Sequence, residues 1–358
     1  MHRRSPLRPW ILRALAGVAV LVLAVGPAHA ALQEPERFAF SDDKVAIYNL
    51  VGHVQVEGGA GPNVVVEVVR GGRDAPQLRI ETGKVDGRRA LRVIYPANRV
   101  VYPELGRGSQ TTLYVRTDGT FGGKRSGGDR VTLAGSGPGL EAHADIRVRV
   151  PAGREVGVYL GAGRAVVANV DGRILVDARS APIEASGMRG WLRIDTGSGA
   201  VRVKDAEGEV EVETGSGRVE IDRVRGTRLY VDTGSGGVRG EELAVAELRI
   251  DTGSGAIQLG RVAAEDVRLD TGSGAVRLEL QTNPRNLDTD TGSGSVTLVV
   301  PASLDAQLEL NTGSGGIDVD LPLQVTRRQR NYLLARAGQG TGSIRVDTGS
   351  GRIQVRAH

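Results

Sequence analysis

A four-residue phrase that returns at a nearly constant spacing constrains the fold of this chain more than any other feature. Thr-Gly-Ser-Gly occurs eight times, and we call the residue that precedes each copy the mark. The marks are Asp195, Glu213, Asp232, Asp251, Asp270, Asp290, Asn311 and Asp347. They are separated by 18, 19, 19, 19, 20, 21 and 36 residues. A period of this length is typical of a chain that winds one coil per repeat.

Apolar residues alternate with polar residues at fixed positions around each mark. In the first regular copy they are Leu192 and Ile194 before the mark, and Val201 and Val203 after it. A period of two residues indicates short strands that each bury one face. Two such strands cannot form a core alone, so successive coils must stack. The sequence therefore predicts an all-β fold, a single-chain parallel β-solenoid (β-helix) with 18–21 residues per coil.

Stacked coils bring equivalent residues of successive repeats into columns, and the environment of each column can be predicted. The column of Ile194 continues through Val212 and Val231, and we expect these three side chains to be buried in contact. On the outer face, Arg193 precedes Glu211 in one column and Arg202 precedes Glu220 in another. Parallel strands lie about 4.8 Å apart, so opposite charges in one column are expected to pair.

The first 30 residues are predicted to be a secretory signal peptide. Four arginines precede the apolar run Ala14–Val25, and Ala28-His29-Ala30 forms a small-x-small cleavage site. The run has 12 residues, which is short for a membrane span, so an uncleaved anchor is the less favoured alternative. We expect an exported protein whose mature chain begins at Ala31. It would reside in the periplasm, the cell envelope or the medium, without membrane insertion after the signal is removed.

Charge and composition narrow the classes of function. The chain has 46 Lys and Arg residues and 42 Asp and Glu residues, and removing the four leader arginines balances the two sets. A neutral surface gives no electrostatic reason to bind nucleic acid. The chain has no Cys, which excludes disulfides and thiol chemistry. No catalytic, cofactor-binding or metal-ligating set can be assembled from the sequence, so we expect no enzyme activity and no cofactor.

The mature sequence divides into two regions. Residues 31–150 are predicted to be a degenerate N-terminal β region of the solenoid with loop insertions, and residues 151–358 the regular repeat. The corner at Asp177 has lost its glycines but keeps the flanking apolar columns. Further upstream, Val45–Val56 fits one coil with Tyr48 at the mark.

Two other upstream segments fit the repeat less well. Leu78–Gly83 is predicted to be another imperfect coil, because Leu78 and Ile80 fall in the apolar columns before Glu81-Thr82-Gly83. Tyr95–Gly139 fits worst and is rich in Gly, so it is predicted to be loops.

Asp-Thr-Gly also occurs in the active sites of aspartic proteases, so the corner has two interpretations. The protease needs two such loops whose carboxylates face each other and share a proton. Here six Asp copies would stack in a row, while Glu213 and Asn311 replace Asp without disturbing the repeat. We therefore favour a structural corner, in which Gly accepts positive φ and Asp accepts backbone N–H groups. A cation between the stacked carboxylates is the weaker alternative to a solvent-exposed row.

The combination of "IYNLVGHVQVEGG" near the start and repeated "LRIDTGSGAVRV" units resembles the bacterial putative-adhesin family of β-strand-repeat proteins, a domain of unknown function. The resemblance is strongest from Val156 to Val355. It implies a parallel β-solenoid on an exported or envelope-attached protein, with no catalytic residues to transfer.

Three hypotheses for function follow. The first is an exported non-enzymatic scaffold with adhesin-like binding or a structural role in the envelope, whose protein or surface partner is unknown. The second is a carbohydrate-active β-helix enzyme. The third is an envelope-stress sensor or regulator that acts through a partner.

Binding specificity is expected where the repeat is interrupted, because the coils themselves are alike. The segment Tyr95–Gly139 carries Tyr95, Tyr102, Tyr114 and Phe121 among glycines, and we expect it to bind. The segment Leu323–Gln339 clusters Arg327, Arg328, Arg330 and Arg336 around Tyr332. It is predicted either to recognise an acidic or phosphorylated partner or to cap the open end of the array.

Overall fold

The computed structural model describes residues 34–123 and 127–358, so the signal peptide predicted at residues 1–30 lies outside the described residues. Within this range the chain is all-β, interrupted by two short 3₁₀ turns, η1 (Ala75–Gln77) and η2 (Pro103–Leu105). None of the helical segments among the described residues is long and apolar enough to cross a membrane.

Strands occupy most of the described chain. Those of the N-terminal region are β1 (Glu36–Phe40), β2 (Lys44–Gly58), β3 (Val64–Gly71), β4 (Arg79–Val85), β5 (Arg88–Ile94), β6 (Arg99–Val101), β7 (Gln110–Val115), β8 (Asp129–Ala134) and β9 (His143–Val150). The repeat region continues with β10 (Arg154–Ala168), β11 (Asp171–Ser180), β12 (Ile183–Ser186), β13 (Arg189–Ser198), β14 (Val201–Thr214), β15 (Val219–Thr233), β16 (Val238–Thr252) and β17 (Ile257–Thr271). The last strands are β18 (Val276–Leu280), β19 (Asn286–Thr291), β20 (Val296–Val300), β21 (Ala306–Thr312), β22 (Ile317–Asp320), β23 (Gln324–Arg328), β24 (Tyr332–Ala337), β25 (Gly342–Thr348) and β26 (Ile353–Ala357).

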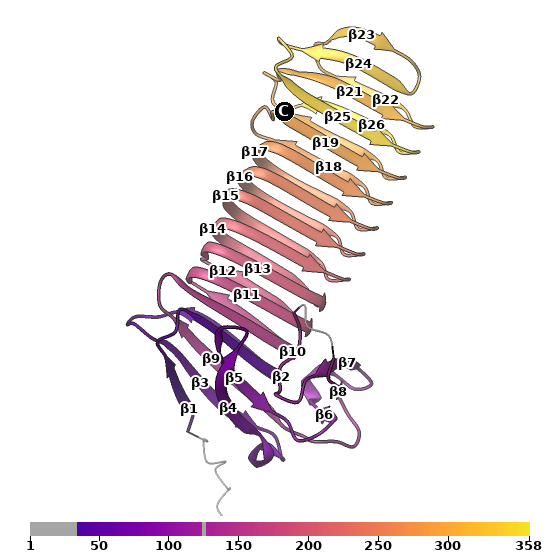
Figure 1. Cartoon of the computed structure of the whole chain (residues 1–358). Coiled ribbons are helices and arrows are strands. Elements are labelled where there is room, and N and C mark those ends of the chain that lie inside the picture. Colours follow the sequence, from indigo (N-terminus) through magenta and orange to yellow (C-terminus); the bar gives the residue numbers. More distant parts are fainter. Residues whose placement is uncertain (1–33, 124–126) are drawn as a thin grey trace, which may run out of the picture. The chain divides into compact units, whose positions relative to one another are not determined.

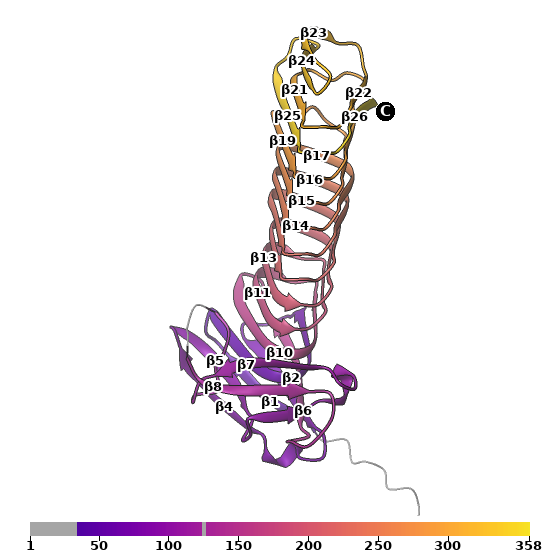
Figure 2. The same ribbon diagram turned by 90° about the vertical axis from the view of Figure 1, so that its right-hand side faces the viewer.

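Successive repeat units stack in two parallel ladders, which Figure 1 and Figure 2 show from two sides. The strands before the mark pair in register, so that Asp177, Asp195 and Glu213 are direct neighbours. The strands after the corner pair equally, with Val201 beside Val219. The predicted parallel stacking of the strands is therefore confirmed from Asp177 through Asp290, including the corner that lacks glycine.

One continuous apolar core runs between the two ladders. It holds Ile194, Val212 and Val231, each with an exposed fraction of 0%, as their column predicts. The outward columns also pair as expected, because Arg193 lies 3.2 Å from Glu211 and Arg202 lies 2.6 Å from Glu220. Side-chain alternation thus sets both the buried and the charged columns.

The hydrogen bonds that fix the Thr-Gly-Ser-Gly corner are made by its Thr and not by the Asp at the mark. In seven corners the Thr Oγ1 accepts the N–H of the second Gly, at 3.0 to 3.1 Å. The same hydroxyl donates to a glycine carbonyl of the adjacent unit in five of them, as Thr252 does to Gly236 at 3.1 Å. The prediction that Asp caps these N–H groups is wrong, since the buried Thr is closer to them and the mark side chain points outward.

Glycine is required in these corners by close stacking instead of by positive φ. A Cβ on Gly255 would lie 2.0 Å from the Gly236 carbonyl oxygen of the adjacent unit, and the other corners repeat this contact. From Gly215 onward none of the corner glycines has positive φ. The expectation of a left-handed corner is therefore wrong for these units, because what the stack excludes is the side chain itself.

A left-handed residue does recur at a second corner, where the column holds glycine at Gly187 but not in the next four units. Asp205, Arg223, Glu242 and Arg261 have φ between 50° and 57° and fall in one column. Their charges alternate along the stack, with Arg223 2.6 Å from Asp205 and Arg261 2.8 Å from Glu242. These exposed pairs partly offset the cost of a left-handed conformation in a residue with a side chain.

The order of units along the stack departs from their order in the chain near the C-terminus. β25 pairs with β19 on one side and with β21 on the other, both in parallel. β26 likewise lies between β20 and β22. The final unit is therefore inserted between the two units that precede it, and the expectation that successive coils stack in chain order is wrong here.

The N-terminal region combines one regular unit with antiparallel additions. β2 pairs in parallel with β10 and places Tyr48 beside Tyr159, so the unit predicted at Val45–Val56 is confirmed. The imperfect coil predicted at Leu78–Gly83 is wrong, because β4 pairs antiparallel with β5 as a hairpin. Apolar alternation is the same for both strand directions, and the short connection Asp86–Gly87 permits only a reversal.

A second sheet forms where the sequence predicts only loops. β8 pairs in parallel with β6 and antiparallel with β7, within the segment Tyr95–Gly139. Its apolar side covers the outward faces of β2 and β10, and encloses a second core around Tyr48, Leu133 and Tyr159. The loop prediction missed it because three short strands separated by glycine-rich turns give only a weak periodic signal.

Candidate functional site

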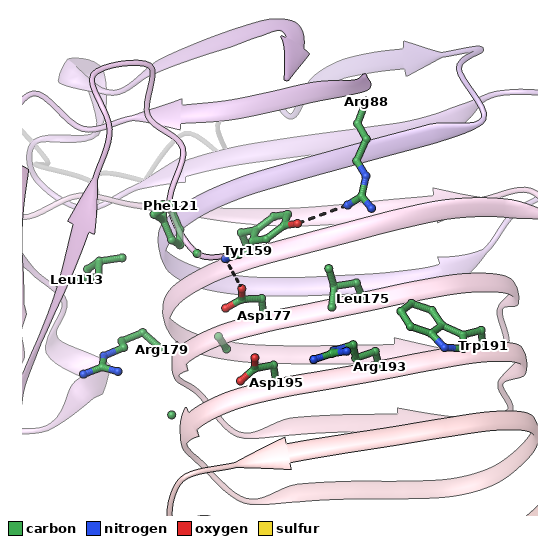
Figure 3. Close-up of a pocket in the computed structure, with 14 residues that line it drawn as sticks. Arg88, Leu113, Phe121, Tyr159, Leu175, Asp177, Arg179, Trp191, Arg193 and Asp195 are labelled. Carbon is green, nitrogen blue, oxygen red and sulfur yellow. Dashed lines mark hydrogen bonds between the residues drawn. The ribbon is translucent and has the colours of Figure 1, made fainter. Parts of the chain in front are cut away.

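A cavity of about 670 Å³ lies on the outer face of the repeat where the covering sheet ends (Figure 3). Its floor is built from β10, β11 and β13. Tyr159 of β10 is buried against the second core, whereas the outward side chains of β11 and β13 at the cavity are only partly buried. The floor and wall residues are Arg88, Tyr159, Leu175, Asp177, Arg179, Trp191, Arg193 and Asp195. The volume lies within the range of about 300–1,000 Å³ typical of small-ligand pockets.

In-register pairing of the three floor strands places the key side chains in rows. Tyr159, Asp177 and Asp195 are successive members of the mark column. Leu175 and Arg193 form the neighbouring row. Because parallel strands keep alternate side chains on one face, all five project from the same side into the cavity, as Figure 3 shows.

The roof comes from the segment that interrupts the repeat. Leu113 on β7 and the loop Phe121–Gly123 line the cavity opposite the floor. The Gly123 N–H donates to Asp177 Oδ2 at 2.9 Å, and so fixes the loop to the floor. A Cβ on Gly122, whose φ is +69°, would lie 2.7 Å from the same carboxylate oxygen. Glycine is therefore required here both by its left-handed conformation and by the close approach.

Three arginines surround the cavity, and each is held by another group. Arg88 lies 2.8 Å from Glu155 and 3.4 Å from the Tyr159 hydroxyl. Arg193 lies 3.2 Å from Glu211 and also pairs with Glu213, both on β14 of the next unit. Arg179 donates to the Thr112 carbonyl at 3.2 Å. The guanidinium groups are thus positioned before any ligand arrives.

The two carboxylates on the floor are in an unfavourable environment for charge. Burial raises the pKa of Asp177, and the Gly123 N–H partly offsets that rise. Burial also raises the pKa of Asp195, which the charge of Arg193 opposes. Asp195 accepts no hydrogen bond from the described residues. A half-buried carboxylate with free lone pairs is a site for a ligand that donates hydrogen bonds.

Aromatic rings supply the apolar surface of the cavity. Tyr159 stacks on Tyr48 with ring centroids 4.4 Å apart, and burial raises the Tyr48 pKa to about 12. Phe121 contacts Tyr48 edge-on at 5.9 Å. Trp191 stacks beneath the Arg173 guanidinium at 4.6 Å. The rings are braced by other side chains, so they form fixed walls.

The sequence locates only part of this site. Of the four aromatic residues singled out in Tyr95–Gly139, Phe121 lines the cavity, Tyr95 and Tyr102 are enclosed in the fold, and Tyr114 is exposed. The floor residues were missed as a group, although a signal exists. The apolar and aromatic residues among them are Tyr159, Leu175 and Trp191. Apolar residues in outward columns, where later units carry charges, indicate that something covers those columns.

The second interrupting segment covers an edge of the stack. β23 and β24 form an antiparallel hairpin, and β24 pairs antiparallel with β21. The Arg327 guanidinium lies 5.5 Å from the Tyr332 ring centroid, and the Tyr332 hydroxyl contacts Glu309 at 3.2 Å. The edge of β21 that faces away from β25 is thereby paired, which is the geometry expected of a cap.

The mark column forms one row of carboxylates instead of facing pairs. Asp232, Asp251 and Asp270 are direct neighbours on successive strands and point the same way. An aspartic protease needs two carboxylates that approach each other from separate loops, which a single row does not provide. Among the described residues, no group of three or more His, Asp or Glu side chains is arranged to hold a metal ion.

Asp251→Asn is expected to leave the fold intact and to be at least as stable as the parent at neutral pH. Burial, together with Asp270 and Asp232, raises the pKa of Asp251. A carboxyl with a raised folded pKa opposes folding while it is ionised, and this cost disappears as the pH falls through that pKa. Asn311 already fills the column and donates to Asp347 at 2.9 Å.

The measurement is the melting temperature of both proteins between pH 7 and about pH 4, the ordinary range of the Asp pKa. Any advantage of the variant should shrink as the pH is lowered. A lower melting temperature of the variant at pH 7 would show that the carboxylate is a required part of the corner.

This chain is similar to a solved structure and to a protein family. A crystal structure of a "putative cell adhesion protein" from Clostridium sporogenes aligns with 91% of this chain and 100% of its own, at 12% identity and a TM-score of 0.20. No match was found among curated proteins. The Toastrack DUF4097 family matches residues 142–356, which span the repeat region and the cavity floor. The chain belongs to the Toastrack DUF4097 family.

Proposed function

We propose that the protein is an exported, non-enzymatic scaffold that binds a ligand or surface through the cavity beside β7. In this proposal the repeat units are coils of a single-chain parallel β-solenoid with 18–21 residues per coil. The solenoid holds the N-terminal binding region, and its other end is closed by the β23–β24 cap. The predicted signal peptide supports a location in the periplasm, the envelope or the medium.

One observation carries the binding proposal. The outward side chains of the repeat are mostly charged or polar along its length, but near β11 and β13 the outer face becomes a walled cavity with aromatic and polar groups together. Concave sites that combine apolar walls with a few fixed polar groups are the usual form of ligand sites. The loop that walls the cavity is also the main interruption of the repeat.

An enzyme acting on carbohydrate is the second candidate, because Asp177 and Asp195 are paired carboxylates with raised pKa values. Glycosidases place two carboxyl groups on either side of the scissile bond. Here the two side chains project from adjacent strands in the same direction. They would contact one side of a ligand, which favours binding over hydrolysis.

Trp191→Ala is expected to weaken capture of the labelled protein by cell envelopes of the source organism at least tenfold. An aromatic anchor that a ligand buries is commonly worth about 2 kcal/mol or more, which exceeds the roughly 1.4 kcal/mol of a tenfold change in affinity. Tyr230→Ala is the matched control, because Tyr230 also lies on the outer face near arginines but outside the cavity. Binding is measured as a function of protein concentration, and folding by thermal denaturation.

The proposal predicts that the control binds like the parent. Equal capture by the parent and by folded Trp191→Ala would show that the cavity is not the binding site. Equal loss in both variants would indicate that the outer face binds without the cavity.

A further inference from the structure

We propose that the cavity binds a neutral saccharide, held by hydroxyl groups that donate to Asp177 and Asp195 and by a sugar face on Trp191. This inference rests on the proposed function, which makes the cavity the binding site. It adds the chemical class of the ligand, and it follows from three properties of the walls: their charges, their free acceptors and their rings.

The charges of the cavity walls are already balanced. Arg88 pairs with Glu155, and Arg193 pairs with Glu211 and Glu213. An anionic ligand would meet the two floor carboxylates, and an ammonium ligand would meet three guanidinium groups. Neither sign of charge is favoured across the whole cavity, which argues for a neutral ligand.

A ligand must offer both hydrogen-bond donors and acceptors to pair the free polar groups of the cavity. Asp195 accepts no bond from the described residues, and Asp177 accepts one from Gly123. Ionised carboxylates only accept and guanidinium groups only donate. A hydroxyl group does both, so neighbouring hydroxyls can donate to the two carboxylates while their oxygens accept from Arg179 or Arg193. Such charge-assisted bonds are stronger than those between neutral groups.

The remaining walls require an apolar surface on the same ligand. Trp191 and Tyr159 contribute to the floor and Phe121 to the roof. A pyranose ring presents C–H groups on its faces and hydroxyls around its edge. It therefore places apolar atoms against the rings and hydroxyls at the carboxylates in one rigid unit, without the entropic cost of ordering a flexible chain.

Trp191 provides a direct readout, because the chain has only one other Trp, Trp10 in the leader. The full chain with Trp10→Phe is titrated with neutral tetrasaccharides of glucose, xylose, mannose and N-acetylglucosamine, while Trp191 emission is followed. Tetragalacturonate and tetraglucosamine are the acidic and basic probes. We expect at least one neutral tetrasaccharide to saturate the emission change below millimolar concentration, and more tightly than either charged probe.

Asp195→Asn in the same background is expected to weaken that binding about tenfold or more, because a charge-assisted bond becomes a neutral one. Asp251→Asn is the matched control, since it makes the same change in the same column outside the cavity. Preferred binding of a charged probe, the absence of any neutral binder, or equal weakening by both variants would overturn the saccharide proposal.

These results separate the two proposals. If Trp191→Ala abolishes envelope capture while no neutral tetrasaccharide binds, the cavity remains the binding site and only the ligand class is wrong. If Trp191→Ala leaves envelope capture unchanged and no neutral tetrasaccharide changes the Trp191 emission, both proposals are wrong. Release of shorter saccharides by the parent but not by Asp195→Asn, followed by chromatography, would keep the ligand class and replace binding with hydrolysis.

Discussion

Val231→Asp is expected to destabilise the folded chain by about 4 kcal/mol, enough to remove most of the stability of an ordinary domain. Val231 has an exposed fraction of 0% and lies in register between Val212 and Ile250, inside a core with no compensating charge. The carboxylate would be buried unpaired, or would fold only in its protonated form. Chemical denaturation followed by circular dichroism at pH 7 measures the loss.

The same column contains the control. Thr289 occupies the equivalent position in β19, is fully buried, and has a hydroxyl with no hydrogen-bond partner in the described structure. Thr289→Val removes that unpaired group and is expected to stabilise the chain by about 1 kcal/mol. A Val231→Asp variant that unfolds at the same denaturant concentration as the parent would contradict the buried ladder.

Gly255→Ala is expected to cost about 3 kcal/mol, the upper end of the range for overpacking. The added methyl group would lie 2.0 Å from the Gly236 carbonyl oxygen and 2.5 Å from its carbon, and both atoms belong to the backbone of the adjacent corner. Relief requires adjacent units to separate, which would weaken the Thr252 hydrogen bond to that carbonyl. Thermal denaturation measures the effect.

Gly237→Ala is the matched substitution one residue beyond the neighbouring corner. Its Cβ would meet no atom closer than 3.5 Å, and the equivalent position is already Ala256 in the next unit. This variant is expected to melt within a few degrees of the parent, since surface changes usually cost less than about 0.5 kcal/mol. A similar loss in both variants would show that the corner tolerates no side chain for a reason other than stacking distance.

The sequence predicts which side chains face the core and which face outward, because apolar and polar residues alternate along each strand. Ile194 faces inward and Arg193 outward because they are adjacent on a strand, and their columns follow from the period. The alternation does not show whether neighbouring strands are parallel or antiparallel. Leu78 and Ile80 fit the same columns, yet Ile80 lies in β4, which pairs antiparallel with β5.

The candidate site was less predictable because it joins segments far apart in sequence. Asp195 and Trp191 belong to the repeat, whereas Phe121 comes from a loop whose position depends on the second core. The role of the corner threonine was also hidden. Thr precedes Gly in every copy, but only the structure shows that its hydroxyl links adjacent units while the Asp beside it faces outward.

The insertion of the final unit also determines the order in which the tip of the stack can assemble. Residues 306–320 are synthesised before residues 342–357, but in the folded chain they rest on them. Stepwise growth from the N-terminus, which suffices for the earlier units, therefore stops at β19 and β20. The last two units and the hairpin between them must therefore fold together in one step. That step is completed only when β25 and β26, near the end of the described chain, pair with the units on both sides.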